Sequence, residues 1–204
     1  GMSLKPGSHL DAVMALSWNK SYRQALASGS ADNSVKVWDV TNQACLHTFS
    51  HHRDKVQCVS GHPTNAWMLA TGSFDQTVGL LDCRTDGSTA ASIGISADIE
   101  DMCWDPFNTN LLYASMENGT VTCVDIRQTS SAMFSFEAHT EGVASISFSP
   151  LVPSMLVTAS ADQTVKVWDT STAPTPQCVA YKSMGVGPLF TVQYYPDQPF
   201  LMAA

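Results

Sequence analysis

Short apolar stretches alternate with polar turns along the chain, and the apolar residues repeat with the two-residue period of β-strands. No stretch combines a 3.6-residue period with helix capping residues. In the first fifty residues the pattern predicts four strands, at Ala12–Trp18, Ala25–Gly29, Val35–Asp39 and Cys45–Phe49. Later segments repeat the same order. The pattern therefore predicts an all-β chain.

The four-strand pattern returns with a period of 43 or 44 residues. Three markers recur in phase: an aspartate that ends an apolar strand, a proline in a turn, and a histidine 30 residues before the aspartate. The aspartates are Asp39, Asp82, Asp125 and Asp169; the prolines are Pro63, Pro106, Pro150 and Pro196; the histidines are His9, His52 and His139. Markers that agree over four units predict a tandem repeat.

The segments that end in these aspartates read SADNSVKVWD, SFDQTVGLLD, MENGTVTCVD and SADQTVKVWD. A four-stranded unit of roughly 40–45 residues that ends in Trp-Asp resembles the blade of a WD-repeat β-propeller. The resemblance implies four complete blades and the start of a fifth, arranged as a partial, open propeller unless copies associate. The expected boundaries are a lead-in at 1–8 (with Gly1 as a cleavage scar) and blades at 9–50, 51–94, 95–138, 139–182 and 183–204.

Three of the predicted blades contain a histidine, a hydroxyl residue and an aspartate, which are the residue types of a nucleophilic triad. The recurrence argues against catalysis, because an enzyme needs one cleft and not three buried copies. The WD-repeat resemblance implies structural tetrads, each completed by a tryptophan. The expected members are His9, Ser28, Asp32 and Trp38 in blade 1; His52, Thr71 and Asp75 in blade 2; and His139, Thr158, Asp162 and Trp168 in blade 4.

Two blades depart from the tetrad pattern. Blade 2 has Leu81 at the tryptophan position. Blade 3 has lost the tetrad entirely, so we expect it to rely on packing alone and to be the softest complete blade. Its residues at the four positions are Ile95, Ala114, Asn118 and Val124.

Composition excludes several other functions. The net charge of −8 and a pI near 5.0 argue against a broad electrostatic surface for nucleic acid or anionic membranes. No apolar run approaches the ~18 residues of a membrane span, and no signal peptide is evident. The six cysteines form no CxxC pair, which favours reduced thiols in the cytosol or nucleus. We expect no cofactor.

Histidine and tryptophan side chains offer two further candidate sites. His51 and His52 could bind a metal, but the pair lacks a third ligand, so no metal site is expected. Trp18, Trp67 and Trp104 fall on or beside predicted strands, and we interpret them as core residues and not as a stacking platform for bases.

The chain also resembles the periodic tryptophan protein 1 family across nearly its whole length, including the linkers between blades. That resemblance implies a non-catalytic scaffold in the nucleus and nucleolus. Its partners would be ribosome assembly factors, with indirect rRNA or chromatin association and no membrane. The family's acidic N-terminal region and last blades are not matched, so we expect a fragment that self-associates. The matching segments include SLKPGSHLDAVMALSWNK, GSFDQTVGLLDCR, AHTEGVASISFSP and PDQPFLMA.

Two alternative functions stay open. Arg84 and Arg127 close two Asp-x-Arg motifs that resemble those of substrate receptors for cullin-RING ubiquitin ligases; alternatively, each arginine pairs with a carboxylate of a neighbouring blade. A chromatin reader would need an aromatic cage for methyl-lysine, for which Phe74, Trp67 and Tyr113 are candidates. Partner contacts at the propeller rim are expected from the loops 20–24 and 64–66.

Overall fold

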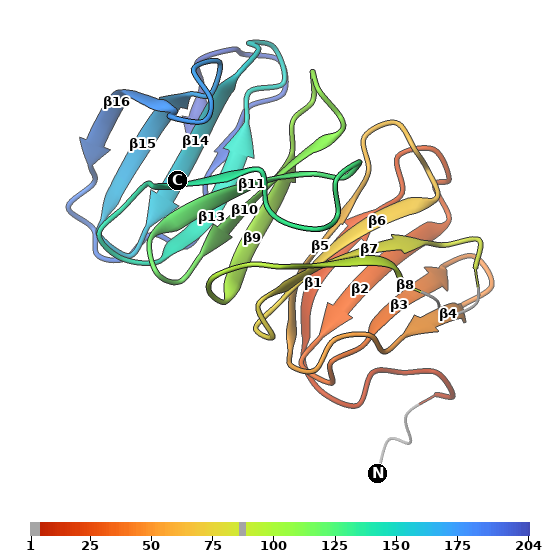
Figure 1. Cartoon of the computed structure of the whole chain (residues 1–204). Helices are drawn as coiled ribbons and strands as arrows, with labels where there is room; N and C mark the ends of the chain where they lie inside the picture. The colour runs from red at the N-terminus through yellow and green to blue at the C-terminus, as the bar shows by residue number, and fades with distance from the viewer. Residues whose placement is uncertain (1–4, 86–88) are drawn as a thin grey trace. The chain divides into compact units, whose positions relative to one another are not determined.

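The computed structural model describes residues 5–85 and 89–204, and within these ranges the chain forms strands and turns without a helix (Figure 1). The all-β prediction is confirmed. No helix in this part of the chain could cross a membrane. The chain divides into two compact units, residues 1–92 and 93–204, which are described separately.

The first unit consists of two antiparallel four-stranded sheets in which each strand pairs with its neighbour in sequence. The second sheet ends in a strand that runs two residues past the unit boundary. Blade 1 comprises β1 (Val13–Trp18), β2 (Ala25–Ser30), β3 (Val35–Asp39) and β4 (Ala44–Phe49). Blade 2 comprises β5 (Val56–Gly61), β6 (Met68–Ser73), β7 (Thr77–Asp82) and β8 (Thr89–Gly94).

The second unit repeats this arrangement and adds a short hairpin. Blade 3 comprises β9 (Ile99–Trp104), β10 (Leu111–Met116), β11 (Thr120–Asp125) and β12 (Phe134–Glu137). Blade 4 comprises β13 (Val143–Phe148), β14 (Met155–Ser160), β15 (Thr164–Asp169) and β16 (Gln177–Ser183). The hairpin pairs β17 (Gln193–Tyr194) with β18 (Met202–Ala203).

Each unit has its core between adjacent sheets, because the middle strands of a blade carry apolar residues on both faces. In the first unit, Val35 and Phe49 of blade 1 pack against Val56 and Leu69 of blade 2, and all four are buried. In the second unit, Phe148 and Trp168 of blade 4 join Tyr113 of blade 3 in one cluster. Adjacent blades therefore stabilise one another by covering apolar faces.

The first loop of each blade is stabilised by a polar side chain at its start. Asn19 Oδ1 accepts hydrogen bonds from the backbone N–H of Ser21 and Tyr22, both at 2.9 Å. The residues 43, 86 and 130 positions later do the same in their own blades through Nδ1, Oδ1 and Oγ, respectively. They are His62, Asp105 and Ser149. These local bonds fix the backbone of each loop.

Blade 3 does not rely on packing alone, so that expectation is wrong. Asp101 on β9 accepts hydrogen bonds at Oδ2 from the backbone N–H of Ile146 (3.0 Å) and the hydroxyl of Ser145 (2.9 Å), both on β13 of blade 4. Its Oδ1 accepts the N–H of Met102 at 2.8 Å. Desolvation raises the pKa of Asp101, although these hydrogen bonds favour its ionised form. The order in which the blades open stays a prediction.

We expect Asp101→Ala to lower the free energy of unfolding by about 1–3 kcal/mol, because the N–H of Ile146 loses its acceptor. Urea denaturation measures this, with exposed Glu137→Ala on β12 as the control.

The same residue predicts a pH dependence. Because the pKa of Asp101 is raised in the folded state, the stability contributed by the protonated carboxyl is present at acid pH and is lost as pH rises through that pKa. Asp101→Asn should therefore gain stability relative to the native chain as pH rises. Equal pH profiles for the Asn variant and the native chain would contradict this assignment.

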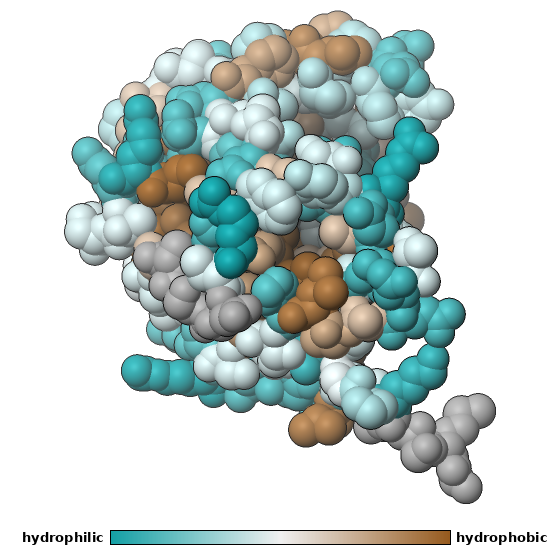
Figure 2. Space-filling model, turned by 90° about the vertical axis from the view of Figure 1, so that its right-hand side faces the viewer, coloured by the Kyte–Doolittle hydropathy of each residue, from teal (hydrophilic) through white to brown (hydrophobic). Residues whose placement is uncertain are grey.

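Blade 1 exposes apolar side chains on β1. Val13, Leu16 and Trp18 are 49%, 63% and 57% exposed, so the expectation that Trp18 is a core residue is wrong. Beside them, Trp38 borders an open cavity of about 420 Å³, whereas Trp168 is buried with the ring of Phe136 at 5.0 Å. Figure 2 shows hydrophobic residues in brown among hydrophilic ones in teal on another view of the surface.

Exposed apolar surface of this kind favours association, and self-association of the purified chain stays a prediction. Multi-angle light scattering across a dilution series should show a mass that rises with concentration. Leu16→Lys should lower that mass, since the Leu16 side chain lies on the exposed face of β1. A monodisperse monomer at every concentration would contradict the prediction.

Candidate functional site

The predicted tetrad residues of blades 1 and 4 are brought together by hydrogen bonds. In blade 1, the Ser28 hydroxyl contacts His9 Nε2 at 2.7 Å and accepts the indole N–H of Trp38 at 2.8 Å. Asp32 Oδ2 lies 2.9 Å from His9 Nδ1. Blade 4 repeats the geometry, with distances of 2.7, 3.0 and 2.9 Å among His139, Thr158, Trp168 and Asp162.

The electrostatics of these groups suit a fixed network better than proton transfer. Burial alone would raise the pKa of Asp162, but hydrogen bonds from Thr164 and His139 outweigh it and lower the pKa to about 2. Burial lowers the pKa of His139, and the bond to Asp162 only partly offsets that effect. The Thr158 hydroxyl is buried and engaged by two nitrogen atoms. It is therefore poorly placed to act as a nucleophile.

Blade 2 replaces the missing tryptophan with a second histidine. Thr71 Oγ1 contacts Nε2 of His52 at 2.8 Å and Nε2 of His51 at 3.1 Å. His52 Nδ1 lies 3.0 Å from Asp75 Oδ2, as in the complete tetrads. Within the described residues, Nδ1 of His51 has no hydrogen-bond partner, so the ring proton belongs on Nε2, facing Thr71. His51 thus supplies the N–H that the indole supplies in blades 1 and 4.

Gly79 makes the space for this histidine. It pairs with Thr71 across β6 and β7, at the position that Lys36 and Lys166 occupy in blades 1 and 4. A Cβ atom on Gly79 would lie 2.5 Å from both His51 Nε2 and Thr71 Oγ1. Burial lowers the pKa of His51 to about 4, which keeps the ring neutral at physiological pH. Both imidazoles are engaged with Thr71, and the described residues contain no metal-ligand cluster.

Gly79→Ala should therefore lower the free energy of unfolding by about 1–3 kcal/mol, because the new methyl group displaces His51 from Thr71. Thermal and urea unfolding measure the change. Gly94→Ala in the same blade is the matched control, since a Cβ there meets nothing within 4 Å. A Gly79→Ala variant as stable as Gly94→Ala would show that His51 does not occupy this position.

Of the four positions at which blade 3 lacks the tetrad residues, one still forms hydrogen bonds of the kind seen in the other blades. Ala114 and Val124 are fully buried and apolar, and no tetrad forms through them. Asn118 keeps the turn function of the missing aspartate: its Oδ1 accepts the backbone N–H and the hydroxyl of Thr120, at 3.1 and 2.6 Å. Ile95 lies before β9 and is partly exposed.

The Asp-x-Arg motifs form ion pairs within the motif itself. Arg84 donates through Nε and Nη2 to both carboxylate oxygens of Asp82, and Arg127 does the same to Asp125. The two arginine side chains are 62% and 64% exposed. The carboxylate of a neighbouring blade is therefore not the partner. Arg84 lowers the pKa of Asp82 to about 2, so the pair is ionised.

The structure does not assemble the proposed aromatic cage. Tyr113 is buried in the core of the second unit. Phe74 and Trp67 lie at opposite ends of β6, about 20 Å apart for a six-residue strand. Lys55 Nζ already covers the Phe74 ring at 3.4 Å from its centre. The three residues therefore cannot hold one methyl-lysine.

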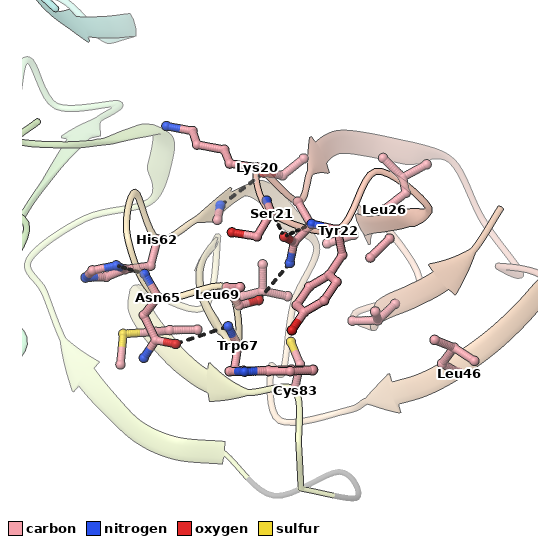
Figure 3. Close-up of a pocket in the computed structure, with 18 of the residues that line it drawn as sticks. Lys20, Ser21, Tyr22, Leu26, Leu46, His62, Asn65, Trp67, Leu69 and Cys83 are labelled. Carbon is pink, nitrogen blue, oxygen red and sulfur yellow. Dashed lines mark hydrogen bonds between the residues drawn. The ribbon is translucent and has the colours of Figure 1, made fainter. Parts of the chain in front are cut away.

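A pocket of about 270 Å³ lies between blades 1 and 2, under the two loops that the sequence analysis placed at the rim (Figure 3). Tyr22 lies in the first loop and Trp67 directly follows the second; their ring centres are 5.0 Å apart, and the two residues are 40% and 41% exposed. Trp67 is therefore not a core residue, contrary to expectation, whereas Trp104 is one. The remaining lining is mostly apolar and includes Leu26, Leu46, Leu69 and Cys83.

The pocket walls are held in place by hydrogen bonds. Asn19 Nδ2 donates to the carbonyl of Ala66 at 2.7 Å and so ties one loop to the other. Asn65 Oδ1 accepts the backbone N–H of Trp67 at 3.1 Å. Burial raises the pKa of the Cys83 thiol to about 11, which leaves it neutral and apolar within the lining. Most of the exposed pocket wall is apolar, so the pocket suits an apolar group, and Lys20, Asp39, His47 and His62 add polar atoms to its lining.

These features define a protein of repeated four-stranded blades, and comparison with known families agrees. The family model described as "WD domain, G-beta repeat" matches residues 3–39, 43–82 and 130–169. The chain belongs to this WD-repeat family, and WD repeats indicate a role in protein–protein interaction. No match covers residues 83–129, which include β9–β11 of blade 3, in line with its lost tetrad; the last match begins before β12.

Individual proteins with similar sequences are more specific than the family model. The chain is 29% identical over 96% of its length to the periodic tryptophan protein 1 homolog of Drosophila melanogaster, covering 43% of that protein. It is 29% identical to periodic tryptophan protein 1 of Saccharomyces cerevisiae, over 93% of this chain and 35% of the yeast protein. A WD repeat-containing protein of Schizosaccharomyces pombe is 34% identical over 93% of this chain, which covers 36% of it. The chain thus spans less than half the length of these relatives.

Proposed function

We propose that the chain is part of a non-catalytic scaffold that assembles proteins during nucleolar ribosome biogenesis, in the maturation of the large subunit and its rRNA. The observation that carries the proposal is the similarity to two periodic tryptophan protein 1 relatives over more than nine-tenths of the chain. The use of histidine, hydroxyl and aspartate side chains in internal networks supports a non-catalytic role. The protein would act in the nucleus, mainly in the nucleolus.

The proposed partners are ribosome assembly factors, and contact with rRNA or chromatin would be indirect. The acidic composition supports this, because a net charge of −8 opposes direct binding to a polyanion. The exposed guanidinium groups of Arg84 and Arg127 belong to ion pairs at equivalent positions in two blades, and they are candidate partner contacts.

The proposal predicts what the tagged full-length parent protein brings down from cells. Quantitative affinity purification, with mass spectrometry and RNA sequencing of the eluate, should enrich large-subunit assembly factors and precursor rRNA. Nuclease treatment should remove the rRNA and leave the assembly factors bound, since the expected contacts are between proteins. Enrichment of a cullin and its adaptor without ribosomal precursors would overturn the proposal in favour of a ubiquitin-ligase receptor.

A further inference from the structure

The pocket between blades 1 and 2 exists because three positions that carry aromatic rings in the second unit carry other residues in the first. Tyr113 pairs with Cys123 on the next strand, and Cys123 pairs with Phe134. The equivalent strand pairs of blade 1 place Ala27 opposite Val37 and Val37 opposite His47.

The third position ends the first strand of the following blade. Phe148 closes β13 and pairs with Leu156, just as Gly61 closes β5 and pairs with Leu69. The positions held by Tyr113, Phe134 and Phe148 in the second unit are therefore held by Ala27, His47 and Gly61 in the first.

The second unit shows what fills this space when it is closed. The Tyr113 ring lies 5.0 Å from Phe148 and 6.2 Å from Phe134 in edge-on geometry, and Tyr113 is only 1% exposed. In the first unit, Ala27, His47 and Gly61 all line the open pocket. Its mouth carries Tyr22 and Trp67, whereas the corresponding residues of the second unit are Asn108 and Ser154. Aromatic side chains thus lie inside this space in the second unit and at its entrance in the first.

The loop at the entrance carries two cations that a partner can contact. Lys20 lines the pocket, extends away from it in Figure 3, and shares its loop with Arg23. In the part of the chain that the structure describes, neither residue forms an ion pair. Asp39 also lines the pocket and keeps its negative charge, but its carboxylate accepts hydrogen bonds from Asn42 and Thr41. Asp82 forms an ion pair with Arg84. The two unpaired cations favour a partner with carboxylates beside its apolar anchor.

We propose that this pocket binds a short peptide segment of a partner protein, with an aromatic side chain inserted between blades 1 and 2 and acidic residues beside Lys20 and Arg23. The inserted ring takes the place that Tyr113 and Phe148 occupy in the second unit, and Tyr22 and Trp67 hold it from the loops. The volume of about 270 Å³ lies just below the range of ligand pockets and suits one or two side chains. This inference deepens the proposed scaffold function and rests on it.

The test is fluorescence polarisation of the full chain with a labelled peptide that has a central phenylalanine flanked by glutamates. Saturable binding below about 1 mM is expected. Replacing the phenylalanine by alanine, or the glutamates by lysines, should weaken binding about tenfold or more, because the anchor or the charge match is lost. Equal binding of the alanine peptide, or no binding of the original peptide, would overturn the proposal.

Protein variants locate the site. Gly61→Phe copies the second unit and should block the pocket, and a Cβ at Gly61 fits because its nearest neighbour is Ser17 Oγ at 3.5 Å. Tyr22→Ala removes one of the two rings at the pocket entrance. Lys20→Glu inverts the charge of an exposed side chain at that entrance and leaves the core unchanged. Each should weaken binding about tenfold. Phe107→Ala is the matched control, since this exposed aromatic residue lies in the corresponding loop of blade 3.

The possible failures are distinguishable. If Gly61→Phe and Lys20→Glu both bind the peptide as the native chain does, the pocket assignment is wrong, whatever the parent protein purifies with. If the peptide binds as expected but the parent protein enriches no ribosomal precursors, the pocket is right and the proposed cellular role fails. Circular dichroism of each variant confirms that the lost binding does not come from lost folding.

Discussion

The structure depends on one constraint: the middle strands of each blade are apolar on both faces, so each sheet must be covered by its neighbours. What fills the space between two blades therefore decides both stability and function. In the second unit the filling consists of interlocked rings around Tyr113. In the first unit part of the same space stays open, and Tyr22 and Trp67 border it. One repeat thus yields a closed core in one place and a pocket in another.

Hydrogen-bonded networks set the geometry within which this packing occurs. A buried hydroxyl in blades 1, 2 and 4 is contacted by two nitrogen atoms, and the second comes either from tryptophan or, in blade 2, from His51. Blade 3 lacks the network and is joined to blade 4 through Asp101. Different residues therefore meet the same requirement that buried polar groups be paired.

The sequence was sufficient for the fold and for the tetrad residues because both recur with one period. It failed where the outcome depends on contacts between repeats. The role of His51 as the partner of Thr71 could not be predicted, because it depends on the register that places Gly79 opposite Thr71. Trp18 and Trp67 were expected in the core, but the exposure of a strand-end residue depends on what the next blade presents. The pocket reflects substitutions on two blades that no local pattern connects.

The structure leaves the space between blades 1 and 2 open at the positions where the second unit places aromatic rings. The most direct measurement is the unfolding free energy of Gly61→Phe relative to Gly61→Ala, without any ligand. If the space is empty, the ring should fill it and stabilise the chain by about 0.5–2 kcal/mol. A Phe variant less stable than the Ala variant would show that this space is already filled and that no pocket lies there.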